Sequence, residues 1–109
     1  MDTDRNRILV ESIRRLLRRG AVLHLRKIID KTHAADLTPA FHSLPLRDQR
    51  KLLDVISDIE KKGELFSRLE SSTFLSLVEG IEIDEVVAVF EQMPTDDVAD
   101  LLGQMPEEM

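Results

Sequence analysis

The chain has 109 residues, a formal net charge of −6 and no cysteine, which is the size of one small domain with a modest hydrophobic core. The absence of cysteine excludes a disulfide framework and thiolate chemistry, and it fits a reducing cytoplasm. No apolar run is long enough to span a membrane, and the first residues lack the long apolar stretch of a secretion signal. We therefore expect a single cytoplasmic domain over residues 1–109.

The first 31 residues, in which we expect two helices, are basic. They hold nine Lys and Arg against four Asp and Glu, whereas residues 32–109 hold six against seventeen. Four arginines flank Leu16-Leu17, namely Arg14, Arg15, Arg18 and Arg19. This segment is either a solvated helix face or a contact for an anionic membrane or an acidic partner. Nucleic acid is disfavoured because no aromatic residue lies among the basic ones and the rest of the chain is acidic.

Pairs of apolar residues recur along the whole chain at nearly constant steps. The pairs begin at positions 16, 28, 40, 52, 65, 77, 89 and 101, so the step is twelve residues, with one step of thirteen after position 52. In the units that begin at Leu69, Ile81 and Met93, the sixth, ninth and tenth residues are apolar, which is one stripe of an α-helix. The pattern predicts an all-α solenoid of short helices in 12-residue units, each packed on its neighbours.

Two places disturb the repeat. Pro39 falls where a helix interior is expected, so we predict a helix that begins near Asp36 or Thr38 and has Pro39 in its first turn. Near the thirteen-residue step, Lys62 takes an apolar column and Gly63 lies in the middle of a unit. We predict one longer helix over about Asp48 to Glu60, a turn at Lys61 to Gly63, and a short helix after it.

The later units carry signals for helix ends and for the core. Ser71 and Thr95 are predicted N-caps, and Gly80 and Gly103 fall near the ends of units, where glycine can close a helix with a positive φ. All four phenylalanines fall in inward-facing columns: Phe41, Phe66, Phe74 and Phe90. The apolar columns are therefore interpreted as a core, without a function of their own.

Acidic residues gather at the start of the last units. Asp96, Asp97 and Asp100 stand at i, i+1 and i+4, so Asp96 and Asp100 share a helix face. Further acids open the neighbouring units, namely Glu82, Asp84 and Glu85 before them and Glu107 and Glu108 after them. We expect stacked helix starts to bring these acids near one another along an edge, where carboxylate oxygens suit Mg²⁺ or Ca²⁺, with Mg²⁺ keeping most of its waters. The alternative is that Asp96 and Asp97 only complement the positive end of a helix dipole.

Signals for other chemistry are missing. His24, His33 and His42 fall in different columns of the repeat and form no H-x-x-x-H pair for zinc. The sequence contains neither a glycine-rich phosphate loop nor a G-x-S-x-G motif. We therefore predict that the chain is not an enzyme and binds no zinc.

The run FEQMPTDDVADLLGQMPEE, preceded by LVEGIEIDEVVAV and AFHSLPLRDQRKLLDVI, resembles the cytosolic amino-terminal domain of MgtE-type magnesium channels. The resemblance covers residues 32–109, and the basic start carries it only weakly. It implies a right-handed superhelix of short helices, followed in the whole protein by paired CBS domains and a membrane channel. In that family, Mg²⁺ held between acidic surfaces keeps the cytosolic domains compact and the channel shut.

The resemblance makes Asp96, Asp97 and Asp100 the candidates to share a weakly bound Mg²⁺ with a neighbouring CBS-type domain. It implies a regulatory domain at the inner face of a membrane, and transport would belong to the channel domain. A homo-oligomer is left open. The alternative is a free-standing interaction scaffold without ion dependence, because FliG-type flagellar motor proteins carry similar helical superhelices.

Overall fold

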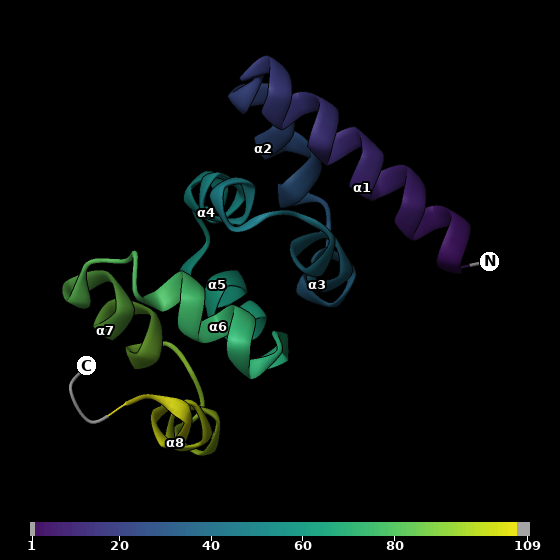
Figure 1. The fold of residues 1–109 in the computed structure, drawn as a ribbon. Helices are drawn as coiled ribbons and strands as arrows, with labels where there is room; N and C mark the ends of the chain where they lie inside the picture. Colours follow the sequence, from purple (N-terminus) through teal and green to yellow (C-terminus); the bar gives the residue numbers. More distant parts are fainter. Residues whose placement is uncertain (1, 107–109) are drawn as a thin grey trace.

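The computed structural model describes residues 2–106, with side chains from residue 5 onward, and over that range it is entirely helical (Figure 1). The helices are α1 (Asp2–Arg19), α2 (Val22–Asp30), α3 (Ala34–Ser43), α4 (Leu46–Val55), α5 (Ile59–Arg68), α6 (Ser71–Val78), α7 (Ile83–Glu91) and α8 (Thr95–Gln104). The all-α prediction is confirmed. None of these described helices has both the length and the apolar composition that crossing a membrane requires.

The helix starts follow the repeat. From α2 onward, the helices begin at residues 22, 34, 46, 59, 71, 83 and 95, which are steps of twelve with one step of thirteen. Each unit is therefore one helix plus one short loop. Helices of eight to ten residues are only about 12–15 Å long and do not persist alone in water, so packing between units stabilises them.

The helices pack mainly on their second neighbours along the chain. In one row, α3 lies between α1 and α5, and α5 also contacts α7; in the other row, α4 lies between α2 and α6. Figure 1 shows the chain advancing from α1 and α2 at one end to α7 and α8 at the other. At that far end α8 packs on α5. The arrangement is consistent with the predicted solenoid.

The core follows the predicted apolar columns. Phe41, Phe66 and Phe74 are fully buried, and Phe66 and Phe74 meet edge to face with ring centroids 5.4 Å apart. Phe90 is half-buried against the same core. Every paired position is at least half-buried except Leu102, whose surface is 54% exposed. No helix follows α8 within the described residues to cover Leu102.

The prediction for Pro39 is wrong. α3 begins at Ala34, so Pro39 is its sixth residue and lies inside the helix. The helix starts earlier because Ala34 and Leu37 are buried on the same side as Phe41. The missing N–H of Pro39 costs one helical hydrogen bond.

The predicted long helix over Asp48 to Glu60 is also wrong. α4 ends at Val55, and α5 runs through Lys61 and Gly63 without a turn. The break lies at residues 56–58 because the Asp58 carboxylate caps a new helix, accepting from the backbone N–H of Glu60 at 2.9 Å and of Lys61 at 3.3 Å.

Gly63 is a packing position, not a turn. It is buried in α5, and a Cβ added there would lie 2.6 Å from Cγ of Met93 and 3.7 Å from Cγ1 of Val89. A side chain at position 63 would therefore require the Met93 side chain, in the loop after α7, to move away from α5.

The expected helix ends differ as well. Ser71 and Thr95 are the first residues of α6 and α8, and the N-cap positions belong to Glu70 and Pro94, which make no side-chain cap. Gly80 and Gly103 keep negative φ, and Gly103 lies inside α8. The positive φ of 68° falls at Gly20, directly after α1.

Candidate functional site at the start of α8

The three predicted aspartates lie on the first two turns of α8. Asp96 and Asp97 are its second and third residues, so both complement the positive end of the helix dipole. Asp96 and Asp100 are exposed and Asp97 is half-buried. Neither ion pair formed by residues 5–106 involves any of the three. Their carboxylates are thus available to a ligand from outside the described chain.

Packing of α8 on α5 brings Asp97 to the same cavity as two glutamates of α5, which are distant from it in the sequence. A cavity of about 220 Å³ lies between α5 and the start of α8, and Asp97, Glu60 and Glu64 all line it. Glu60 and Glu64 are four residues apart and share a face of α5. Their i, i+4 spacing is a signal in the sequence, but only the contact of α8 with α5 relates that face to Asp97.

The described residues do not form a closed metal cage. No group of three or more His, Asp or Glu side chains in that part of the chain is arranged to hold an ion. Carboxylates remain the oxygen ligands that Mg²⁺ prefers, and Mg²⁺ keeps several of its waters in such open sites. The three aspartates are therefore surface carboxylates of the type that can contact a hydrated ion, and the described residues around them do not complete a coordination shell.

The acids that open α7 have a different environment. Glu82, Asp84 and Glu85 are exposed, but Glu85 accepts a hydrogen bond from Nζ of Lys62 at 3.0 Å. The Lys62 side chain is only 11% exposed, which explains how a lysine occupies an apolar column. The charge of Glu85 is thus compensated within the fold. The predicted acids Glu107 and Glu108 lie outside the described residues.

The histidines belong to no cluster of three or more possible metal ligands among the described residues. His24 and His33 are exposed, and Nε2 of His42 accepts the backbone N–H of Glu70 at 3.2 Å. This bond joins the end of α3 to the start of α6. The one buried polar side chain among residues 5–106 is Gln49, whose amide donates to two backbone carbonyls. Both interactions are structural.

Comparison with known protein families gives a match that covers the chain from residue 32 to residue 109. The sequence model of the MgtE intracellular N domain matches residues 32–109, the same range over which the sequence resembles that family. Among curated proteins, none matches the chain. α1 and α2 precede the matched range.

Proposed function

Because this chain belongs to the MgtE intracellular N domain family, we propose that it senses Mg²⁺ through the acids at the start of α8, which dock on a neighbouring domain. Domains of this family are the cytosolic regulatory parts of magnesium transporters and are not catalytic. The proposed partners are a CBS-type domain and the membrane channel domain of the same or a partner chain. The proposed location is the cytoplasmic side of the membrane.

One observation supports the proposal above the others. The carboxylates of Asp96, Asp97 and Asp100 are at least partly exposed and make no ion pair with residues 5–106. Glu60 and Glu64 add negative charge beside Asp97. The helix dipole accounts for Asp96 and Asp97 in the first turn, whereas Asp100, Glu60 and Glu64 add negative charge that the dipole of α8 does not explain.

The mechanism follows from electrostatics. Two unit charges of the same sign about 4 Å apart near a protein surface repel by about 4 kcal/mol, so an acidic partner surface does not settle on this one unaided. A hydrated Mg²⁺ between the two surfaces replaces the repulsion with attraction. Loss of the ion separates the domains and shifts the channel toward its open state.

The affinity of the site for Mg²⁺ must be weak if the fraction of occupied sites is to change with the Mg²⁺ concentration of the cell. A site with millimolar affinity contributes about 4 kcal/mol, which two carboxylates and a hydrated ion supply without a protein cage. We therefore expect Mg²⁺ to act in the millimolar range, and only when the partner domain is present.

The test is a Mg²⁺ titration followed by the amide NMR spectrum of the chain together with its CBS-type partner domain. Wild type is compared with Asp97→Ala/Asp100→Ala, and the matched control is Asp30→Ala/Asp36→Ala, which removes two exposed acids elsewhere. We expect millimolar shifts at α8 in wild type and in the control, and their loss in the first variant.

If the shifts are absent with the partner present, or persist in Asp97→Ala/Asp100→Ala, the acids are ordinary first-turn charges and the proposal fails. The reading frame offers a second check. It should continue past Met109 into CBS-like βαβ segments and hydrophobic spans, and a stop codon there would favour the free-standing scaffold.

A further inference from the structure

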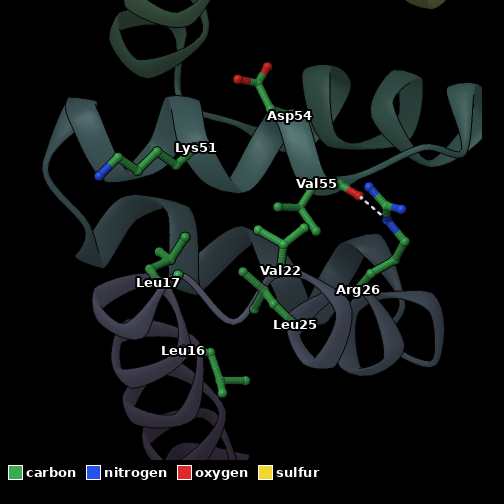
Figure 2. A pocket seen from close by; sticks show the side chains of 9 residues that line it. Leu16, Leu17, Val22, Leu25, Arg26, Lys51, Asp54 and Val55 are labelled. Atoms are coloured by element: carbon green, nitrogen blue, oxygen red, sulfur yellow. Dashed lines mark hydrogen bonds between the residues drawn. The ribbon is translucent and has the colours of Figure 1, made fainter.

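A second hollow lies at the basic end of the molecule. It has a volume of about 370 Å³ and is bounded by α1, α2 and α4 (Figure 2). Its lining is mainly apolar and includes Leu16, Leu17, Val22, Leu25 and Val55. Figure 2 shows Val22, Leu25 and Val55 pointing toward one another and the Asp54 carboxylate pointing away from them. We call this hollow the apolar cavity.

The walls of the apolar cavity are held in place by the fold. Leu16, Leu25 and Val55 belong to the buried core, and Nε of Arg26 donates to the carbonyl of Val55 at 3.4 Å, which ties α2 to the end of α4. Val22 remains 45% exposed at the rim. The cavity is therefore a preformed apolar site that is open to solvent.

A basic groove adjoins the apolar cavity. It has a volume of about 500 Å³ and shares Leu17 and Lys51 with the cavity. Its charged lining residues are four cations and one acid, namely Arg14, Arg18, Arg47, Lys51 and Asp48. Of the four cations, Arg14 alone forms an ion pair among residues 5–106, with Glu11 at 3.5 Å. The groove thus holds an excess of positive charge directly beside an apolar site.

We propose that the apolar cavity and the basic groove together bind an acidic amphipathic helix of a partner protein. An apolar side chain of that helix enters the cavity, and carboxylates one turn away, about 5.4 Å along its axis, pair with Arg18, Arg47 and Lys51. This is helix-in-groove recognition, in which charge complementarity selects the partner.

The shape of the site favours a helix over a membrane. A lipid surface is contacted by protruding apolar side chains, whereas this site is concave and its apolar lining is recessed between three helices. The residues that line the two hollows lie on or beside α1, α2 and α4, and none of them belongs to α8 or to the cavity that Asp97 lines. The proposal is therefore independent of the Mg²⁺ response at α8.

The probe for this site is a fluorescent synthetic helix with leucines on one face and glutamates beside them, measured by anisotropy at low salt. Arg18→Glu/Arg47→Glu reverses two exposed charges of the groove. Arg15→Glu/Arg19→Glu makes the same charge change on α1 outside both hollows. We expect the groove pair to weaken binding about tenfold or more and the control pair less than about threefold.

The apolar contact is tested in the same assay. Val22→Asp places a charge at the cavity rim and should weaken binding about tenfold, whereas Leu23→Asp, at a 74% exposed position outside the cavity lining, should not. A probe with alanine for leucine, or with glutamine for glutamate, should lose binding. Far-UV circular dichroism confirms that each variant is folded.

Several results would overturn the proposal. An equal loss of affinity in the groove pair and the control pair of arginine variants would mean that the helix is attracted only by unspecific charge. An unchanged affinity in Val22→Asp would mean that the helix does not enter the cavity. Binding to phosphatidylserine vesicles that depends on the groove pair, without binding of the helix, would assign the site to a membrane. Salt-sensitive self-association of the wild-type chain, removed by the groove pair, would assign it to a second copy.

Discussion

Replacing Gln49 with methionine tests how the units are joined. The Gln49 side chain is 7% exposed, and its Nε2 donates to the carbonyl of Phe41 at 2.6 Å and to that of Leu44 at 3.0 Å. One amide of α4 therefore satisfies the C-terminal end of α3. Methionine has a similar size and helix propensity, so Gln49→Met removes the two hydrogen bonds with little change in packing.

The expected loss of stability depends on which hydrogen-bond donors the two carbonyls keep in the variant. The Phe41 carbonyl still accepts the N–H of Leu44 at 3.2 Å, so it keeps one of its two partners. The Leu44 carbonyl loses its side-chain donor and is left in an apolar setting. A net value of about 1 kcal/mol for each bond gives a loss of about 2 kcal/mol in the free energy of unfolding, or roughly 10 °C in Tm for a domain of this size.

The assay is urea unfolding followed by circular dichroism at 222 nm. Gln104→Met is the matched control, because Gln104 is exposed on α8 and should change stability by less than about 0.5 kcal/mol. We expect a lower urea midpoint for Gln49→Met with an unchanged slope. A midpoint equal to that of wild type or of Gln104→Met would refute the role assigned to this amide.

Two further predictions concern packing. Gly63→Ala should destabilise by about 1 kcal/mol despite its better helix propensity, because the new Cβ collides with Met93. Gly80→Ala should be nearly neutral because its Cβ would meet only the flexible end of an arginine side chain, and equal urea midpoints for the two variants would contradict this reasoning. Leu101→Ala should cost about 2–5 kcal/mol and Leu102→Ala less than about 1, since only Leu101 is buried. By amide hydrogen exchange, Leu101→Ala should expose α7 and α8 before α3, whereas uniform loss of protection would mean that the array unfolds as one block.

The periodicity of the chain was sufficient to predict the helix class and the spacing of the units. An i, i+3, i+4 apolar stripe needs only local sequence, and its repetition at twelve residues gives the number and spacing of the helices, although not the residue at which each helix begins. The family could be recognised for a similar reason, because the segment MPTDDVADLLGQMPEE is contiguous. The position of the three aspartates at the start of a helix could likewise be predicted from their spacing.

The predictions at Gly63 and at residues 56–58 are wrong for two different reasons, one long-range and one local. Gly63 was interpreted as a turn because nothing near it in sequence shows that Met93 lies against it. The local sequence around residues 56–58 is compatible both with an N-cap at Asp58 and with a helix that continues through it. The structure adopts the cap.

The candidate site also has one part that the sequence predicts and one part that only packing between helices determines. The sequence places Asp97 on a helix start, but its proximity to Glu60 and Glu64 arises because α8 folds back onto α5. The compensation of Glu85 by Lys62 arises because α7 also packs on α5. Short helices with a strict period specify what each unit is, whereas the burial of their shared faces determines which acids remain uncompensated and which hollows stay open.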